Sequence, residues 1–414
     1  MTKNNKLTII IPTRERCETL PYTLRTCIAQ NYDNLEILVS DNHSKDKTKE
    51  VLDSFDDERI KYINTGQRLS MSHNWEFALN HVTEGYVFFL GDDDGFLPNT
   101  MLQINSIISA HNASAIGWLC PHYRWPDFDY GRSNMLSIHT EDFTIKLLNA
   151  KDELRGILDL NNPNKGCGIL PSLYRNFVDI KYIKKVKELT KNFFLSQIPD
   201  YYSGIALAAV IDDFVYTSTP FSISGGSGRS NGASQFNQHI NSKESNLFDN
   251  EGNIPYHKNF TKSYTSSVFS AECYLQAQDA GLFSKEFFDI DYIQIIRASL
   301  QEAKTNHPSR YKYLVDCLIE LAKINDIPKE NVLREIAKYP NKPLNDTHDY
   351  IVEGYNHLTK RIDVDASKYG AKNVYDAVLL YEKIYNNRHE FMKLQNSIIP
   401  TISIIKRELM KRYL

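Results

Sequence analysis

The sequence predicts an α/β fold in which a mainly parallel sheet is flanked by helices. Short, largely apolar runs occupy residues 7–12, 35–40, 60–63 and 86–90, and the first is rich in β-branched residues. Segments with helical spacing of apolar residues separate these runs, so strands and helices alternate. Because parallel neighbours need crossover connections, the alternation favours one sheet with helices on both faces.

Each of the first elements has its own local signals. Residues 7–12 are a β-branched, largely apolar run that ends at a proline, as expected of a strand covered on both faces. The next segment places four apolar residues on one helical face, namely Leu20, Leu24, Cys27 and Ile28. The Ser44 and Asp46 region is expected to cap the helix after the second strand. Either Ser70 or Ser72 is expected to cap the helix before the fourth strand.

Composition and charge limit the number of domains, the partners and the cellular compartment that the sequence predicts. The chain has 414 residues, 42% of them hydrophobic, which indicates two or three domains. A net charge of -3 and a pI near 6.5 argue against nucleic acid as a partner. The six cysteines are widely spaced without a C-x-x-C pair, so we expect thiols in a reducing compartment. The apolar run near the N-terminus is too short for a signal peptide and no later run reaches the ~18 residues of a spanning helix, so we expect a cytoplasmic protein.

Polar clusters follow three of the predicted strands. Pro12, Thr13, Arg14 and Glu15 follow the first strand, Asp41 and Asn42 end the second, and Asp92, Asp93 and Asp94 follow the fourth. Ligands of open α/β sheets bind at the carboxyl ends of the strands. The three clusters are therefore expected to form a single binding site.

The three consecutive aspartates suggest a metal site. Like charges held together at a sheet edge are well compensated by Mg²⁺ or Mn²⁺, which prefer oxygen ligands and often share them with substrate phosphates. Gly91 and Gly95 on either side would let the backbone approach a ligand closely. The alternative is a solvated acidic turn that caps a helix beginning near residues 97–98.

Four ordered segments resemble the family 2 glycosyltransferases of the GT-A fold, a group of inverting enzymes that build bacterial surface polysaccharides. They are residues 9–14, 37–42, 70–79 and 88–98. The resemblance implies that Thr13 contacts the nucleotide and that Asp41 hydrogen-bonds the nucleobase, usually uracil. It implies a base or diphosphate contact for Arg68. Asp92 and Asp93 resemble the D-x-D pair that touches the ribose and the metal.

The assignment of the metal ligands is less direct, because Gly91 stands where many members carry an aspartate. Asp93 is the first choice and Asp94 the second. Each residue also has a structural alternative: Thr13 can satisfy backbone at a strand end, Asp41 can cap a helix, and Arg68 can be a solvated loop charge.

The acceptor side is expected beyond residue 115, where the alternation weakens. Residues 169–177 and 198–207 resemble the family's acceptor segments. An inverting transfer needs a base that deprotonates the acceptor hydroxyl, and Asp200 is the candidate, although Pro199 replaces the usual acidic neighbour. Asp200 is also expected to be a helix N-cap. Asp212 and Asp213 are the alternatives for the base.

Residues 224–234 are rich in glycine and serine. They form either a flexible linker or a lid that orders over the diphosphate, with Arg229 as the phosphate contact. Some GT-A enzymes carry an additional metal-binding histidine after this region. His239, or alternatively His257, can take that role.

The predicted domains are residues 1–262 and 263–414. The first is the GT-A catalytic domain, divided into a nucleotide-sugar-binding part at 1–115 and an acceptor part at 116–262. The second is a helical domain that braces the first, dimerises or binds the acceptor. Its end is a basic amphipathic helix, with apolar residues at 398, 402, 405, 409 and 413, that can pack on the body or make peripheral contact with the inner face of the cell membrane.

The leading hypothesis is a metal-assisted transfer of a sugar from a nucleotide-diphosphate sugar, probably UDP-linked, to a hydroxyl of a surface or lipid-linked glycan. A nucleotidyltransferase is a second candidate, but residues 12–16 lack the glycine-rich loop that it needs. A catalytically silent carbohydrate-binding or scaffold protein is the third. A dinucleotide oxidoreductase is disfavoured because no G-x-G-x-x-G follows the first strand. The sugar and the linkage cannot be predicted from these patterns.

Overall fold

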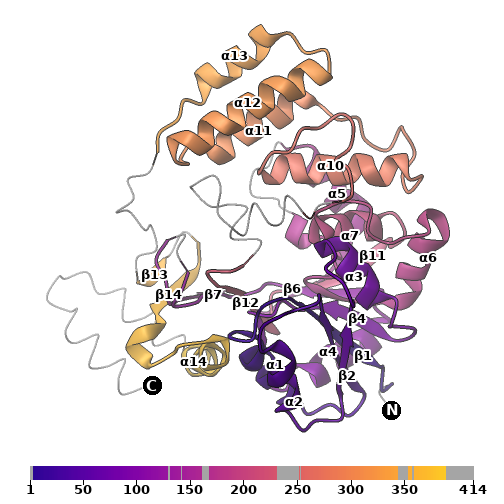
Figure 1. Cartoon of the computed structure of the whole chain (residues 1–414), viewed down its shortest axis with the longest axis vertical. Coiled ribbons are helices and arrows are strands. Elements are labelled where there is room, and N and C mark those ends of the chain that lie inside the picture. The colour runs from indigo at the N-terminus through magenta and orange to yellow at the C-terminus, as the bar shows by residue number, and fades with distance from the viewer. Residues whose placement is uncertain are drawn as a thin grey trace, which may run out of the picture.

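The computed structural model describes most of the 414-residue chain. The described residues are 3–128, 131–140, 142–160, 167–230, 251, 253–343, 353–356 and 359–387. They fold around two β-sheets, and a group of helices extends from one side of this body (Figure 1).

The larger sheet begins with the parallel strands that the sequence predicts. These strands are β1 (Leu7–Thr13), β2 (Leu35–Asp41), β3 (Ile60–Asn64) and β4 (Tyr86–Phe89). Three helices connect them in turn: α1 (Leu20–Ile28), α2 (Thr48–Asp53) and α3 (Met71–Leu79). The strand order is β3-β2-β1-β4, with every pair parallel. Ser70 caps α3 by accepting from the backbone N–H of His73, as one of the two predicted caps.

The second half of this sheet is mixed. It contains β6 (Ala115–Trp118), β9 (Ile145–Asn149), β10 (Asn176–Asp179) and β11 (Asp213–Thr217). Strand β10 lies antiparallel between β4 and β6, and β11 is parallel to β6. The helices of this half are α4 (Thr100–His111), α5 (Ala150–Leu158), α6 (Ile180–Thr190) and α7 (Pro199–Ala208). The predicted α/β class with a mainly parallel sheet is confirmed, with β9 and β10 as its antiparallel strands.

The smaller sheet collects strands from distant parts of the chain. Its order is β13-β14-β8-β7-β12-β5. The strands are β5 (Gly95–Phe96), β7 (His122–Arg124), β8 (Met135–His139), β12 (Ser222–Gly226), β13 (Gly354–Asn356) and β14 (Arg361–Asp365). Helix α14 (Val374–Asn386) packs against this sheet and against α1. The strands β13 and β14 differ from the helices predicted throughout 263–414, because β14 finds its pairing partner in β8, far away in the sequence.

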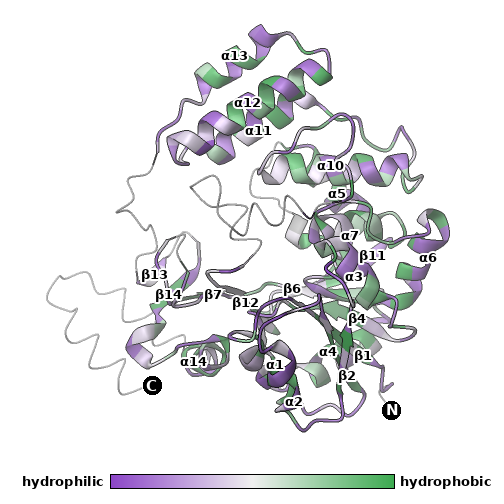
Figure 2. Ribbon diagram, in the orientation of Figure 1, coloured by the Kyte–Doolittle hydropathy of each residue, from purple (hydrophilic) through white to green (hydrophobic). Residues whose placement is uncertain are grey.

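A helical group covers the other side of the body. It comprises α10 (Ser266–Asp279), α11 (Tyr292–Ala303), α12 (Pro308–Ile324) and α13 (Lys329–Lys338). Apolar residues concentrate in the strands of the larger sheet, whereas α11, α12 and α13 carry polar and apolar residues together (Figure 2). None of the described helices is long and apolar enough to cross a membrane. The predicted amphipathic segment at 398–413 lies outside the described residues.

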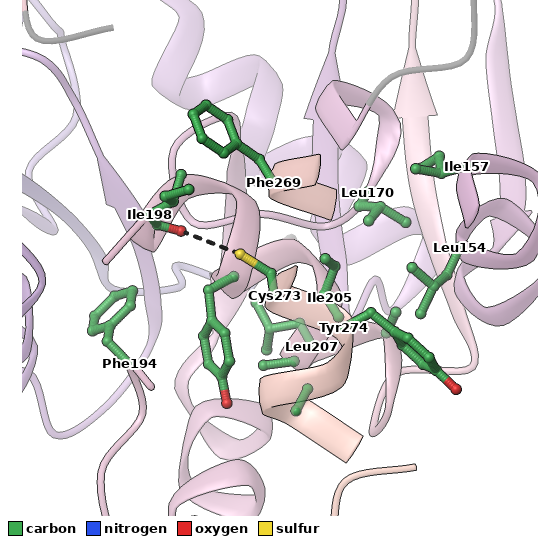
Figure 3. Packing of buried hydrophobic residues seen from close by; sticks show 14 of the residues in the cluster. Leu154, Ile157, Leu170, Phe194, Ile198, Ile205, Leu207, Phe269, Cys273 and Tyr274 are labelled. Carbon is green, nitrogen blue, oxygen red and sulfur yellow. Dashed lines mark hydrogen bonds between the residues drawn. The ribbon is translucent and has the colours of Figure 1, made fainter. Parts of the chain in front are cut away.

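The helical group is joined to the α/β body through α10 and α7. Tyr274 and Cys273 of α10 lie beside Ile205 and Leu207 of α7, and Leu154 of α5 lies close by (Figure 3). The Cys273 thiol donates to the carbonyl oxygen of Ile198 at 4.0 Å. These side chains belong to one continuous apolar cluster, so the helical group shares its core with the larger sheet.

Candidate functional site

The carboxyl ends of β1, β2 and β4 meet at one edge of the larger sheet. Strand β1 lies between β2 and β4, with Thr13 opposite Asp41 in the register. The hydroxyl of Thr13 donates to Asp92 Oδ2 at 2.7 Å, and Arg16 Nε lies 3.6 Å from Asp92 Oδ1. The structure therefore brings the first and third predicted clusters into direct contact.

Asp93 is held by the glycine-rich segment. Its Oδ2 accepts hydrogen bonds from the backbone N–H of Ser227 at 3.1 Å and from the hydroxyl at 2.7 Å. Trp125 Nε1 donates to its backbone carbonyl at 3.0 Å. A Cβ on Gly225 would lie 1.8 Å from that carbonyl oxygen, so only glycine fits there. Residues 222–226 form strand β12, so the linker interpretation does not apply to this part of the glycine-rich segment.

Asp94 is engaged by protein donors on both carboxylate oxygens. Gly225 N–H donates to Oδ1 at 2.6 Å, while Gly91 N–H and the Tyr174 hydroxyl donate to Oδ2 at 3.0 and 2.8 Å. A Cβ on Gly91 would lie 2.8 Å from Asp94 Oδ2, and one on Gly95 would meet Thr26 and α14. The two glycines therefore make room for protein atoms, which differs from the predicted approach to a ligand.

Burial disfavours the ionised forms of the three aspartates. It raises the pKa of Asp92 to about 6, with Arg16 opposing the shift. It raises the pKa of Asp94 to about 7, and the neighbouring charge of Asp93 adds to the shift. Burial also raises the pKa of Asp93. A cation placed here would favour the ionised carboxylates.

The donor set fits a divalent cation only in part. Within the described part of the chain, no group of three or more His, Cys, Asp or Glu side chains could hold a metal ion. Asp92 and Asp93 are two adjacent carboxylates, the number that Mg²⁺ commonly takes from a protein when substrate phosphates supply other ligands. The pair therefore suits a cation that binds together with a diphosphate.

The two histidines predicted as additional ligands differ in their placement. His239 lies outside the described residues. His257 lies against the helical group, where its Nε2 is 3.1 Å from Asp279 Oδ2 and its ring contacts Phe260. Neither contact places His257 beside the three aspartates of residues 92–94.

Asp41 and Asn42 make hydrogen bonds that shape the edge of the site. Asp41 Oδ2 accepts from the Tyr62 hydroxyl at 2.8 Å and from Asn64 Nδ2 at 3.1 Å, and Oδ1 accepts from Ser44 N–H. Asn42 accepts from the backbone N–H of Leu69 and donates to its carbonyl. Asn42 thus fixes the loop that carries Arg68.

Four arginines lie around the ends of β1 and β2. Arg14 and Arg68 both form ion pairs with Glu251. Arg229 Nη1 donates to the carbonyl of Glu15 at 3.2 Å, and its own carbonyl accepts from Arg16. The segment carrying Arg229 therefore closes on the loop after β1.

Two residues of this loop have backbone roles. Pro12 pairs with Ser40 in the register of β1 and β2. Glu15 adopts a left-handed conformation, and its carboxylate accepts from the backbone N–H groups of Lys45 and Asp46.

A pocket of about 70 Å³ lies beside the loop, lined by Arg16, Glu18, Thr19, Trp125, Asp127, Ser227 and Arg229.

Asp200 lies in the first turn of α7. The N-cap of α7 is Ile198, without a side-chain cap, so the predicted capping role of Asp200 is wrong. Pro199 occupies the first helical turn, where its missing N–H is tolerated. Burial raises the pKa of Asp200, while Arg175 opposes the shift.

The alternative bases lie elsewhere. Asp213 begins β11, which runs in the same direction as β4, so it lies at the opposite edge of the sheet from the aspartates. Asp212 precedes it and forms an ion pair with Lys151 on the surface. Neither residue can face a donor bound at the carboxyl ends of the strands.

Three contributors to the site are not predicted by the sequence patterns. Arg16 forms an ion pair with Asp92, and the hydroxyl of Ser227 donates to Asp93. The charges of Asp94 and Asp200 contribute to the raised pKa of Arg175. Arg16 and Ser227 lie within segments that the sequence had marked, but their partners are fixed by the fold. Arg175 lies within residues 169–177, which resemble the family's acceptor segment, but nothing in that pattern singles it out.

Comparison with known proteins agrees with the geometry. Residues 8–166 match the family described as Glycosyl transferase family 2. A Campylobacter jejuni GalNAc(5)-diNAcBac-PP-undecaprenol beta-1,3-glucosyltransferase is 35% identical over 99 residues, which cover 23% of this chain and 32% of that protein. The Escherichia coli UDP-Glc:alpha-D-GlcNAc-diphosphoundecaprenol beta-1,3-glucosyltransferase WfgD is 27% identical over 108 residues, which cover 26% of this chain and 43% of that protein.

Among solved structures, S. aureus TarS has 14% identity and a TM-score of 0.46, with 84% of this chain and 57% of that chain covered. The matches to the two curated relatives span less than half of either relative's length.

Proposed function

Because residues 8–166 match Glycosyl transferase family 2, we propose that this protein transfers a sugar from a UDP-linked donor to a hydroxyl group of a lipid-linked surface glycan. The observation that carries the proposal is the hydrogen bond between Thr13 and Asp92, which unites the ends of β1 and β4 beside Asp41. The names of the two relatives support the class of substrates, since both include an undecaprenol diphosphate and one includes UDP-Glc.

The donor is expected to bind across the ends of β1, β2 and β4. Asp41 receives the nucleobase beside Tyr62 and Asn64, which hold its carboxylate in place. Thr13 lies between this position and the aspartates. The loop formed by residues 12–15 lies around the nucleotide. Asn42, at the end of β2, supports the neighbouring loop.

Cationic side chains are available for the diphosphate. Arg14, Arg16, Arg68 and Arg229 lie near the loop after β1, and guanidinium groups bind phosphate through paired hydrogen bonds. Glu251 pairs with two of these arginines, so a bound diphosphate would take over a position that this carboxylate now occupies.

Asp92 and Asp93 would hold Mg²⁺ or Mn²⁺. Such an ion supplies Lewis-acid stabilisation of the leaving diphosphate when bound. Asp94 has a different role in this proposal, because its three protein hydrogen bonds position the turn that carries the other two aspartates.

Asp200 is the proposed general base. It accepts the proton of the acceptor hydroxyl while that oxygen attacks the anomeric carbon from the side opposite the leaving group, which inverts the configuration. Burial raises the pKa of Asp200, and a raised pKa strengthens its basicity at neutral pH.

A panel of sugar nucleotides with Mn²⁺, followed by thermal shift and by donor turnover, tests the proposal. We expect stabilisation by a UDP-sugar that Asp93→Asn abolishes. Asp200→Asn should keep donor binding and lower transfer at least ~100-fold. Asp212→Asn, at the opposite edge of the sheet, is the matched control and should keep both activities.

Each alternative predicts a different result. Absence of stabilisation and turnover with every donor would favour a carbohydrate-binding or scaffold protein. Pyrophosphate release from a nucleoside triphosphate would favour a nucleotidyltransferase. Full transfer by Asp200→Asn would reject the assignment of the base alone.

A further inference from the structure

One carboxylate joins two arginines that come from different loops of the site. Glu251 forms an ion pair with Arg14, which directly follows β1. It forms a second ion pair with Arg68, which follows β3, with 2.5 Å between Arg68 Nε and Glu251 Oε1. Strand β2 lies between β1 and β3 in the sheet. The bridge therefore spans the carboxyl end of β2, where Asp41 and Asn42 are found.

The arginines around this bridge are crowded. Arg14 is the more enclosed of the two, with 21% of its side chain exposed against 43% for Arg68. Burial lowers the pKa of Arg14; Glu251 opposes the shift, whereas the charges of Arg68 and Arg16 add to it. Cations held this close together are stabilised by an anion between them. Glu251 supplies that anion in the structure.

A carboxylate and a phosphate compete for the same guanidinium groups. Arginine binds both anions through paired N–H donors of its planar fork. A diphosphate at Arg14 and Arg68 therefore needs the donors that Glu251 takes, and its negative charge repels the carboxylate. Binding of the diphosphate at these arginines is expected to displace Glu251.

The chain after Glu251 keeps it close to the arginines. The carbonyl of Ile254, three residues further on, accepts from Gln197 Nε2, and that of Pro255 accepts from Gln276 Nε2 at 2.8 Å. Gln197 precedes α7, and Gln276 belongs to α10. Three residues span at most about 11 Å, so a displaced Glu251 stays within reach of its partners. A short tether of this kind gives a group a high effective concentration at its binding position.

We propose that Glu251 is an internal competitor of the donor diphosphate: it holds Arg14 and Arg68 until the donor displaces it, and it returns to them when the nucleoside diphosphate leaves. The proposal rests on the proposed function, because it concerns how tightly the donor site of that function holds its ligand. It assigns Glu251 no contact with the reacting atoms. The expected consequences are weaker binding of UDP and faster release of UDP after the transfer.

A positioning role for the same residue makes the opposite prediction. In that case Glu251 orients the two arginines for the diphosphate and stays in place when the diphosphate binds. Removal of its charge then weakens the binding of UDP, whereas removal of a competitor strengthens it. The sign of the change in affinity therefore distinguishes the two roles.

Calorimetric titration of the full chain with UDP and with uridine, both in the presence of Mn²⁺, measures this sign. We expect Glu251→Gln, which keeps the shape of the side chain but loses its charge, to bind UDP at least about fivefold more tightly than the unmodified protein. Uridine has no phosphate and should bind the two proteins equally. Glu84→Gln is the matched control, because Glu84 is exposed, pairs with Lys6 before β1 and lies at the opposite edge of the sheet.

A double variant tests whether Glu251 acts through the arginines. Arg68→Gln should bind UDP more weakly, and Glu251→Gln in that background should give a smaller gain in UDP affinity than in the unmodified protein. An equal gain in both backgrounds would show that Glu251 acts through its overall charge alone, and would overturn the competition for Arg68.

The remaining outcomes separate the competitor from the proposed function. If the unmodified protein binds UDP and Glu251→Gln binds it equally or more weakly, the competitor is wrong and the function stands. If neither protein binds UDP or uridine, the function fails, and titration with inorganic pyrophosphate tests the competitor alone. Tighter pyrophosphate binding by Glu251→Gln then supports the competitor, and equal or weaker binding overturns it. A thermal melt of each variant confirms that it is folded before titration.

Discussion

The two sheets differ in how far apart their neighbouring strands lie in the sequence. In the larger sheet, β1, β2 and β3 pair in sequence order and a single helix connects each pair. In the smaller sheet, Gly95 of β5 pairs with Ile223 of β12, and Ser137 of β8 pairs with Asp363 of β14. The aspartates follow β4 of the larger sheet, and Thr13 of β1 donates to Asp92. Strand β12 of the smaller sheet and the residue after it, Ser227, add donors to Asp94 and Asp93. Both sheets therefore fix the geometry of the site.

The largest expected effect comes from changing the contact between the sheets. Gly225→Ala would place a Cβ 1.8 Å from the carbonyl oxygen of Asp93, so β12 has to move away from the aspartate turn. Because the obstacle is backbone, we expect a loss of about 3 kcal/mol or more in the free energy of unfolding. Chemical denaturation measures it, and donor binding should fall as well.

Gly226→Ala is the matched control on the neighbouring residue. A Cβ there would meet only the ring of Phe128 at 3.3 Å, which can shift slightly. Equal destabilisation by the two variants would show that the contact with Asp93 is not what joins the sheets.

A second, smaller effect tests whether α14 belongs to the same folding unit. Val378 is buried where α14 meets β5, so Val378→Ala leaves a cavity. We expect a loss of about 2 kcal/mol, in one cooperative transition with the larger sheet. Circular dichroism and tryptophan fluorescence during denaturation should report the same midpoint.

The next residue gives the control. Leu379 is 41% exposed on the same helix, and Leu379→Ala should change the stability by less than about 0.5 kcal/mol. Two separate transitions in either variant would mean that α14 and the smaller sheet unfold independently of the larger one.

The same contrast explains what could be predicted from the sequence. Strands β1 to β4 were predicted because each is a local apolar run, and the crossover rule then arranges them. The pairing of β14 with β8 could not be predicted, because Ser137 and Asp363 are 226 positions apart and both strands are short. The position of β10 between β4 and β6 could not be predicted either, because no local sequence pattern indicates it.

The aspartates show the same limit within the site. Their location at a strand end was predicted, and the hydrogen bond from Thr13 to Asp92 joins two of the predicted clusters. In the sequence, however, Asp93 and Asp94 are chemically alike. The fold distinguishes them through Ser227 and Gly225, which are 134 and 131 positions away. Their different hydrogen bonds depend on long-range contacts that a local pattern does not contain.

The last prediction concerns the charge of the aspartates between the two sheets. The pKa of Asp92 is raised to about 6 and that of Asp94 to about 7, mainly by burial, so the folded chain binds protons more tightly than the unfolded chain. Without added metal, the contribution of Asp92 and Asp94 to stability should therefore be complete below about pH 4 and should be lost as the pH rises through 6 and 7. Thermal melts between pH 5 and pH 7.5 measure this slope.

Two changes should reduce the slope for different reasons. Asp94→Asn removes one of the titrating groups, whereas Mn²⁺ with UDP favours the ionised form of Asp92 and Asp93 in the folded chain. Asp213→Asn, which alters an exposed carboxylate at the opposite edge of the sheet, should leave the slope unchanged. If stability instead rises with pH in the absence of metal, the aspartates are already compensated by the protein, and the smaller sheet does more than position them.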